Sequence, residues 1–410
     1  MLNADQPPPK RRRHELWEGD VQSLVRSFAR LQEARDGVAM HALLRATERK
    51  ACPANVEVPG GTEPVAAAVA RAWLKGASEE SIEALSGALK RWCVQYAAGG
   101  MPRQGPAAQW MLPPLLWLSS RPRILATQLD AGSRDRQLKK LVEVVREMFQ
   151  KLHSRETRHG CMAMCCELLR LYFLLGQASQ CSFLLAAVSQ SQRGEKFDPA
   201  ALPKSLAVTL CFMWGKHCVL DGKVTEAEEK LSWALANCPP AQAGNRRRIL
   251  EYLIPCRLRL GHFPSQKMLK RHGLEGFAGI CWATWRGDVR LFDSEFAKQE
   301  SWLIRTGTYL MVEKLKTLVY RNLCVRVHQV VAAEIDKKGK SEHRHKQDLR
   351  PYEIAFRWQD DFDEIETVGM LAHLIYLGAI RGYISDEHQK IVFSKDAPFP
   401  APEVWNVKLG

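Results

Sequence analysis

Apolar residues recur at intervals of three and four along most of the chain, and this spacing predicts amphipathic helices. The segments 65–97 and 136–154 show the pattern clearly, whereas residues 51–64 and 98–106 are predicted loops because they gather glycine and proline. The first third of the chain is therefore predicted to be helical. Its first apolar stripe, within residues 19–36, consists of Val21, Leu24, Val25, Phe28 and Leu31.

From residue 161 onward, helical segments come in pairs with a glycine at the turn of each pair. Such a glycine supplies the positive φ that ends a helix. The glycines are unevenly spaced, so the pattern indicates a degenerate array of helical hairpins whose neighbours must stack to bury their apolar faces. One hairpin has a tetratricopeptide-like pattern of Gly222, Ala227, Leu231, Ala234 and Pro239. The turn glycines are Gly176, Gly222, Gly261 and Gly287.

The last hundred residues change character and predict a winged helix. Three helices followed by a β-hairpin is the element order of that relative of helix-turn-helix domains. In chain order we expect a long helix at 306–335, a polar basic loop at 336–350, helices at 351–359 and 363–380, and strands at 381–386 and 390–394.

The predicted fold is thus an all-α array of helical hairpins, similar to tetratricopeptide repeats, followed by a C-terminal winged helix with a small β-hairpin. Its predicted parts are a basic disordered tail (1–15), an N-terminal helical region (16–135), the repeats (136–304), the winged helix (305–400) and a tail (401–410).

The charge of the chain favours an acidic partner. Its 410 residues are 46% hydrophobic and 25% charged, as in ordinary soluble proteins, but the net charge is +14. The cluster at 7–14 is a nuclear import signal, a nucleic-acid arm or merely a solvated tail. We find no signal-peptide core and no apolar run of about 18 residues, so we expect a soluble intracellular protein without membrane insertion.

The 12 cysteines follow no disulfide or zinc pattern, and we expect buried, reduced thiols in a reducing compartment. Cys161 with His159 or His153 resembles a Cys–His pair, but such pairs arise often by chance. Phosphate-loop, esterase, metalloprotease and dinucleotide motifs are absent from the sequence. His343 and His345 alone are too few for a metal site. We therefore expect no catalysis, no cofactor and no metal.

Three long stretches carry a resemblance to a known family: "NRRRILEYLIPCRLRLGHFPS" (245–265), "VEKLKTLVYRNL" (312–323) and "LAHLIYLGAIRGYISDEHQKIVFSKDAPFP" (371–400). They resemble PCI-domain subunits of the TREX-2 messenger-RNA-export complex, over roughly residues 140–400. The resemblance implies a non-catalytic adaptor at nuclear pores, with shuttling to the cytoplasm as an open alternative. It implies pairing of the winged helix with a larger GANP-like PCI scaffold, a small acidic proteasome-lid-type partner, and binding of RNA, with DNA as a further candidate. The loop at 336–350 departs from the family by being longer and more basic.

Basic residues of the predicted winged helix are the candidates for nucleic-acid contact. The loop lacks aromatic residues, so it would contact phosphates without choosing a sequence, unless it is simply solvated. The helix after residue 362 begins with acids, which phosphates repel, so docking of this helix in a major groove is not expected. The candidates are Lys337, Lys338, Lys340, Arg344, Lys346 and Arg350 in the loop, Lys314, Lys316 and Arg321 in the first helix, and Arg381, Lys390 and Lys395 in the wing.

Arg246, Arg247 and Arg248 open an apolar helix, where positive charge is unfavourable for the helix dipole. They are either a solvated face with local salt bridges or a docking site for the small acidic partner. For the whole chain, the alternative function is a PCI scaffold of the proteasome lid, the signalosome or an initiation-factor complex without nucleic-acid contact. A hydrolase hidden in the cysteine-rich helices is a third, weaker hypothesis.

Overall fold

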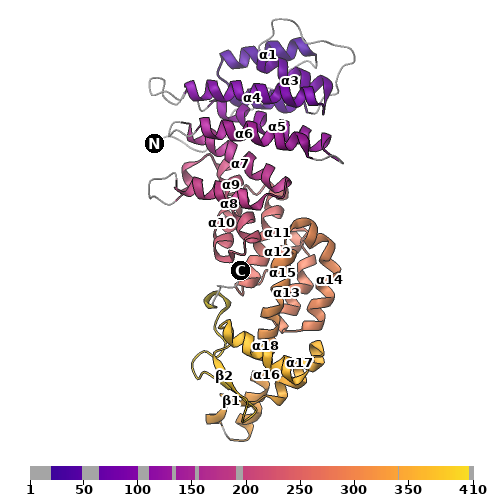
Figure 1. The fold of residues 1–410 in the computed structure, drawn as a ribbon, viewed down its shortest axis with the longest axis vertical. Coiled ribbons are helices and arrows are strands. Elements are labelled where there is room, and N and C mark those ends of the chain that lie inside the picture. The colour runs from indigo at the N-terminus through magenta and orange to yellow at the C-terminus, as the bar shows by residue number, and fades with distance from the viewer. Residues whose placement is uncertain are drawn as a thin grey trace. The chain divides into compact units, whose positions relative to one another are not determined.

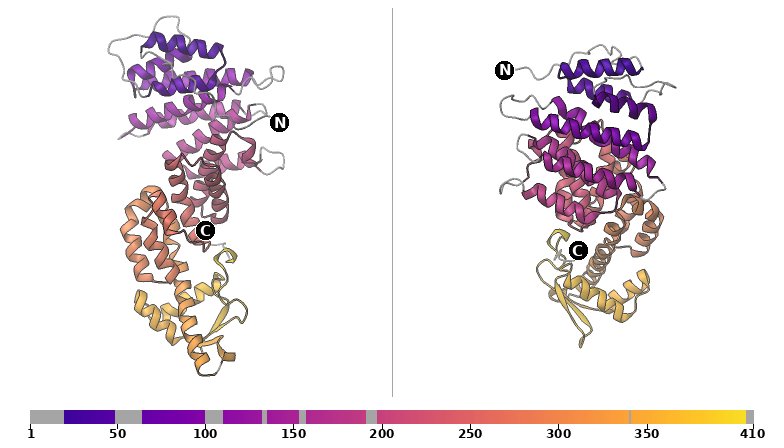
Figure 2. Two further views of the ribbon diagram at one scale, coloured as in Figure 1. Left: turned by 180° about the vertical axis from the view of Figure 1, so that it is seen from behind. Right: turned by 45° about the horizontal axis from the view of Figure 1, so that its top comes forward.

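The structure is a computed structural model that describes residues 20–48, 64–99, 110–131, 135–152, 157–190, 197–339 and 341–405. Within these ranges the chain is helical except for a small sheet near the C-terminus (Figure 1, Figure 2). The predicted basic tail, Lys340 and residues 406–410 lie outside the described residues. A helix long and apolar enough for a membrane is not found in the described part of the chain.

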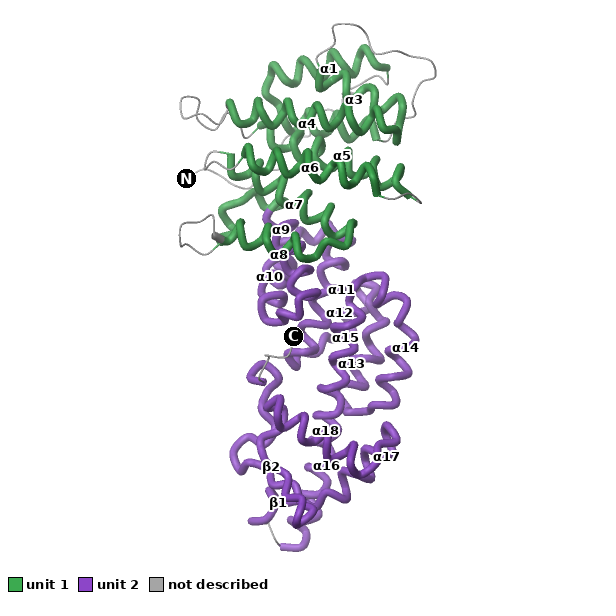
Figure 3. The backbone as a smooth tube through the Cα atoms, in the orientation of Figure 1, with its two compact units in different colours: residues 1–206 green, residues 207–410 purple. Residues whose placement is uncertain are grey.

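The chain divides into two compact units, Met1–Leu206 and Ala207–Gly410 (Figure 3). The predicted boundary at residues 304 and 305 falls inside the second unit, so the last hairpins and the winged helix form one compact body. The five predicted parts of the chain remain predictions.

The first unit consists of helices whose apolar stripes face each other. Asp20 caps the first of them, since its carboxylate accepts a hydrogen bond from the Ser23 amide at 2.7 Å. Leu24 and Phe28 on this helix are each 1% exposed, as their spacing predicted. The helices are α1 (Val21–Glu33), α2 (Gly37–Ala46), α3 (Pro64–Lys75), α4 (Glu79–Gly99), α5 (Leu112–Leu129), α6 (Arg136–Lys151), α7 (Arg158–Leu174) and α8 (Ala178–Gln190).

The hairpin array continues through the second unit. The four turn glycines all have positive φ, which confirms their predicted place at helix ends. The following elements are α9 (Lys204–Leu220), α10 (Val224–Asn237), α11 (Ala243–Arg259), α12 (Gln266–His272), α13 (Gly276–Arg286), α14 (Val289–Thr306) and α15 (Tyr309–Glu313).

Gly287, in the turn between α13 and α14, packs against the first helix of the winged helix. Its φ is +74°, and a Cβ added there would lie 2.3 Å from the backbone nitrogen of Leu323 in α16 (Lys316–Lys337). Glycine is therefore required at position 287 for two reasons: the left-handed backbone conformation and the close approach of α16. The side chain of Asn322 adds a hydrogen bond of 2.7 Å to the carbonyl oxygen of Thr284.

The winged helix has the predicted hairpin and one strand more. β2 (Gly382–Ser385) pairs antiparallel with β3 (Lys390–Phe393), and β1 (Lys346–Asp348) pairs with the other edge of β3. The sheet order is therefore β1-β3-β2. α17 (Arg350–Asp360) and α18 (Glu364–Tyr376) complete the domain.

Two sequence predictions for this domain were wrong. The loop at 336–350 contains the end of α16, a short 3-10 turn at Ser341–His343 and the strand β1. The helix predicted at 306–335 is two helices, α15 and α16, with a break around Lys314. β1 escaped prediction because its residues are all polar and its pairing partner is distant in sequence.

Candidate nucleic-acid interface and partner surface

A hollow of about 670 Å³ opens beside the sheet of the winged helix, and we name it the wing hollow. Its walls come from α16, from the segment that leads into β1, and from the chain that leaves β3. It brings together three predicted nucleic-acid residues from distant positions, namely Arg344, Lys346 and Lys395. The full lining is His328, Glu342, His343, Arg344, His345, Lys346, Phe393, Ser394, Lys395 and Pro398.

One buried amide, Gln347, anchors the basic segment that forms this wall. Gln347 is 1% exposed, whereas its neighbours Lys346 and Asp348 in β1 face solvent. Its Nε2 donates hydrogen bonds to the carbonyl oxygens of His328 (3.3 Å) and Arg344 (3.0 Å). Its Oε1 accepts one from the Tyr352 hydroxyl at 2.6 Å. Because strand residues alternate in direction, the buried Gln347 sets Lys346 outward, at the hollow.

Several basic side chains near the wing hollow are free of protein partners. Lys346 and Lys395 line the hollow, and Lys338 caps the C-terminus of α16. All three are exposed, and within the described residues their ammonium groups have no side-chain hydrogen bond or ion pair. Arg381 is also exposed and unpaired in that part of the chain. These side chains can contact phosphates without breaking an existing interaction.

Other predicted contacts carry ion pairs. Where both partners are exposed, such a pair contributes about 0–1 kcal/mol, so a phosphate can replace the carboxylate at little cost. Glu353 is buried, so its pair with Arg350 is not of this kind. The nucleic-acid role of these basic residues therefore stays a prediction. The pairs are Lys337 with Glu334 (2.8 Å), Arg344 with Asp336, Arg350 with Glu353 (3.3 Å) and Glu364 (3.4 Å), and Lys390 with Asp348 (3.5 Å).

Lys316 and Arg321 are bound within the protein more firmly. The ammonium group of Lys316 lies 3.0 Å from the Asp293 carboxylate and 3.2 Å from that of Asp360. The guanidinium of Arg321 donates to the carbonyl oxygen of Phe399 at 3.0 Å. Both are partly buried, and both join α16 to other segments of the second unit. The structure favours a structural role for them, and Lys314 alone of the predicted first-helix residues keeps a side chain without partners in the described chain.

His328 lines the wing hollow but does not add positive charge to it at neutral pH. Its ring packs edge-on against Phe393 and Phe399, with centroids 4.6 Å and 5.3 Å away. This burial lowers the pKa of His328 below its ordinary value of 6.5. At neutral pH the imidazole is therefore uncharged, and the positive potential of the hollow comes from its lysines and arginine.

The α18 helix keeps the acidic N-terminus that argued against docking in a major groove. Asp363 and Glu366 form a capping box, in which each side chain accepts a hydrogen bond from the other residue's amide. Leu371 and Leu374 of α18 are fully buried. This helix therefore serves the core of the winged helix, and its acidic end is turned to solvent.

The arginines of α11 have three different surroundings. Arg246 donates to the carbonyl oxygens of Leu235 (3.0 Å) and Cys238 (2.8 Å) at the C-terminal end of α10. It thereby satisfies acceptors that a helix end leaves unpaired. Arg247 pairs with Glu251 at 3.3 Å. Arg248 is exposed and has no partner within the described chain, so only Arg247 and Arg248 remain available to an acidic ligand.

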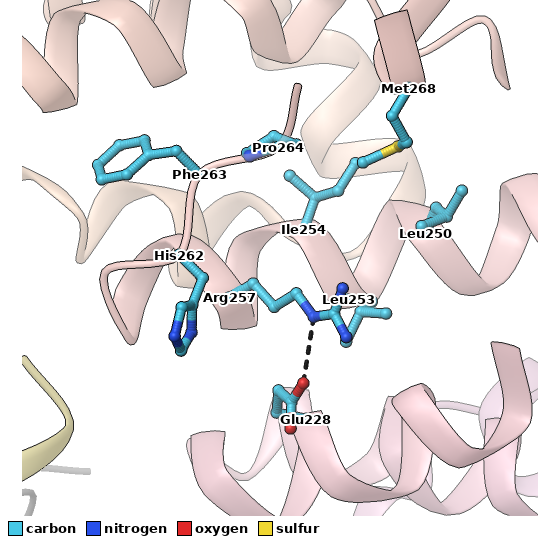
Figure 4. A pocket seen from close by; sticks show the side chains of 9 residues that line it. All are labelled: Glu228, Leu250, Leu253, Ile254, Arg257, His262, Phe263, Pro264 and Met268. Carbon is cyan, nitrogen blue, oxygen red and sulfur yellow. Dashed lines mark hydrogen bonds and ion pairs between the residues drawn. The ribbon is translucent and has the colours of Figure 1, made fainter. Parts of the chain in front are cut away.

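An apolar hollow of about 280 Å³ lies on the same helix (Figure 4). Its rim carries one ion pair, in which Arg257 donates to Glu228 at 3.1 Å. An aromatic or aliphatic side chain fits such a hollow, and the nearby arginines suit acidic neighbours. Its lining is Glu228, Leu250, Leu253, Ile254, Arg257, His262, Phe263, Pro264 and Met268.

Comparison with known proteins identifies the family. No family model matches the chain. A protein of Xenopus laevis named "PCI domain-containing protein 2" is 31% identical over 71% of this chain and 73% of its own length. The "PCI domain-containing protein 2 homolog" of Drosophila melanogaster is 36% identical over 60% of this chain and 58% of its own length. The chain belongs to the PCI domain-containing protein 2 family.

The chain is also similar to plant and fungal proteins that carry other names. "Enhanced ethylene response protein 5" of Arabidopsis thaliana is 30% identical over 71% of this chain and 70% of its own length. "Protein CSN12 homolog" of Neurospora crassa is 30% identical over 58% of this chain and 54% of its own length. The resemblance to PCI-domain proteins is thus confirmed, and none of these names denotes an enzyme.

The cysteines within the described residues of this PCI-domain chain are poor nucleophiles. Those within the described residues are buried, and burial raises the pKa of Cys161 to about 12. A thiol with such a pKa is protonated at neutral pH, and His153 of the predicted Cys–His pair lies outside the described residues. Groups of three or more metal-ligating side chains are not found in the described chain.

Sequence reasoning missed Gln347, the residue that orders the basic wall. In the sequence, Gln347 is an uncharged residue between charged neighbours. That pattern alone is too weak to predict that its side chain is buried. The sequence predicted phosphate contact for the whole basic loop. Among its described lysines and arginines, only Arg344 and Lys346 line the hollow.

Proposed function

We propose that the chain is a non-catalytic adaptor of a nuclear messenger-RNA-export complex similar to TREX-2, and that its wing hollow contacts nucleic acid without sequence preference. The observation that carries the proposal is the pair of exposed, unpaired lysines that line this hollow, Lys346 and Lys395, together with the exposed Lys338 at the C-terminus of α16. Phosphate contacts from lysines give affinity but do not read sequence. Family membership supports the adaptor role.

We further propose that the partners are a larger GANP-like PCI scaffold, which pairs with the winged helix, and a small acidic proteasome-lid-type protein. The exposed Arg247 and Arg248 lie on α11, the helix that also contributes to the apolar hollow, and they support the second partner, because an acidic chain with one bulky anchor residue suits both features. The proposed location is the nucleus, at nuclear pores.

The test is binding of fluorescent single-stranded RNA to the full chain, alone and co-purified with its scaffold partner. Replacing Lys338, Lys346 and Lys395 by glutamine lowers the affinity at least about tenfold, equally for unrelated sequences. The matched control replaces Lys204, Lys267 and Lys270 by glutamine, which removes the same charge from exposed sites of α9 and α12 without a side-chain partner among the described residues. The control keeps the wild-type affinity.

A chain that binds no RNA in either state would contradict the adaptor proposal and favour the scaffold of another PCI assembly. Equal losses in both triple variants would show that net charge alone matters, so the wing hollow would not be the site.

A further inference from the structure

Two exposed tryptophans stand together on α13. Trp282 and Trp285 are three residues apart, so the helix places them on one face. Their rings stack with centroids 5.3 Å apart and 28° between the ring planes. Even so, 50% and 49% of their surfaces remain exposed, while Phe277 and Ile280 of the same helix are fully buried. The pair is therefore outside the core, although burying such rings stabilises most proteins strongly.

Two arginine side chains lie against the rings of this tryptophan pair. The guanidinium carbon of Arg286 lies 5.6 Å from the ring centroid of Trp282, and that of Arg326 lies 4.9 Å from the ring centroid of Trp285. Both distances allow cation–π attraction. Arg326 comes from α16, so the arrangement joins two elements that pack side by side (Figure 1). Flat π surfaces next to positive charge suit a ligand that is both aromatic and anionic.

The platform is rigidly placed. The Gly287 turn brings the end of α13 against the backbone of α16, and Asn322 fixes Thr284 by its hydrogen bond. These contacts fix the backbone that carries the rings, and the rings stack on each other, so binding loses less conformational entropy than on a mobile segment.

A second hollow of about 250 Å³ adjoins Trp285. Arg321, Asn322, Arg326 and Gln329 contribute its polar wall, and no carboxylate is found among the described residues that line it. This hollow shares the middle of α16 with the wing hollow, since Gln329 lines the former and His328 the latter. The segment after β3 borders both hollows, through Pro402 and Pro398. The hollow beside Trp285 therefore has a positively charged wall without a carboxylate among its described lining residues.

We infer that Trp282 and Trp285 form a stacking platform for the bases of single-stranded nucleic acid, with Arg286 and Arg326 contacting the adjacent phosphates. The inference rests on the proposed nucleic-acid function and deepens it by adding base contacts to the phosphate contacts of the wing hollow. Stacking on tryptophan accepts every base, because every base has a π face, so it agrees with binding that does not choose a sequence. An apolar peptide would gain nothing from the arginines.

The test compares two probes on the full chain, a fluorescein-labelled oligoadenylate and an abasic oligonucleotide of the same length and backbone. Replacing both tryptophans by alanine lowers the affinity for oligoadenylate at least about fivefold. It leaves the affinity for the abasic probe unchanged, because that probe has phosphates but no bases. The W282F/W285F variant keeps most of the affinity, since phenylalanine retains a ring.

The matched control is Trp358→Ala. Trp358 is 63% exposed on α17 and has the guanidinium of Arg290 at 5.0 Å, but among the described residues no second ring stacks on it. The control binds oligoadenylate as the wild type does.

The outcomes separate the two proposals. If the wild type binds neither probe, the proposed function and the platform both fail. If it binds oligoadenylate and W282A/W285A binds equally well, the platform alone is wrong. An equal loss for both probes would also overturn the platform, because it would assign the tryptophans a role in shaping the unit. The platform would also be overturned if W282A/W285A lost a protein partner but still bound oligoadenylate as the wild type does.

Discussion

The arginines of α11 and the lysines of the wing hollow are both basic clusters of the second unit, but their surroundings differ. Arg246 is half-buried and donates to two carbonyl oxygens at the end of α10. Lys346 and Lys395 are exposed beside a hollow and have no partner within the described chain. A run of basic residues therefore does not define a binding site. The decisive property is whether the protein itself already uses each charge.

The largest expected effect comes from removing the residue that orders the wing hollow. Gln347→Ala leaves the buried Tyr352 hydroxyl and two carbonyl groups without their partner, which lowers the free energy of unfolding by about 2–3 kcal/mol. Urea unfolding of the full chain measures the loss. Gln266→Ala, at an exposed position of α12, serves as the control and stays near wild type. A stable Gln347→Ala variant would show that the basic wall needs no anchor.

Arg246→Ala tests the other side of the comparison. It removes two charge-assisted hydrogen bonds from a half-buried site, so we expect a loss of about 1–2 kcal/mol in unfolding free energy and no change in RNA affinity. Urea unfolding and RNA titration of the same variant measure both quantities. Unchanged stability with weaker RNA binding would reverse the roles assigned to the two clusters.

Arg247→Glu with Arg248→Glu sharpens the comparison within α11. Both positions are exposed, so stability changes by no more than about 0.5 kcal/mol. The reversed charges repel an acidic ligand, so co-purification of the small acidic partner weakens while RNA affinity stays the same. If the small acidic partner co-purifies with the variant as well as with the wild type, Arg247 and Arg248 do not belong to the partner interface.

The smallest expected effect concerns His328 at the floor of the wing hollow. Burial lowers the pKa of His328 from its ordinary value of 6.5, so below that pH the unfolded chain binds a proton that the folded chain does not. Stability therefore falls as the pH drops below 6.5, and His328→Gln removes this part of the decline. Unfolding midpoints above and below pH 6.5 measure it. An identical decline in wild type and variant would refute the assignment.

Local sequence signals predicted the architecture well. The three- and four-residue spacing in α1, the glycines at hairpin turns and the β2–β3 hairpin all depend on neighbouring residues, and all appear in the structure. The winged helix followed from element order, and the family resemblance is confirmed by the relatives.

The details of the site depend on contacts between distant residues, which the sequence does not display. Lys316 was a candidate for phosphate contact because Asp293 and Asp360, its partners, are far away along the chain. β1 exists because β3 offers an edge, although its own residues are polar. The tryptophan pair was overlooked because Arg326 approaches it from another helix. Trp405 in the predicted tail folds back and donates to the carbonyl oxygen of Pro400 at 3.2 Å, another contact that the sequence does not display.

The salt dependence of RNA binding tests the central claim most directly. Each phosphate contact on a single strand steepens the slope of log K against log salt by about 0.7, so the K338Q/K346Q/K395Q variant should have a slope shallower by about 2 than the wild type. The Arg246→Ala variant should keep the wild-type slope. An unchanged slope in the lysine variant, or a shallower slope in Arg246→Ala, would contradict the account that the wing hollow holds the free charge.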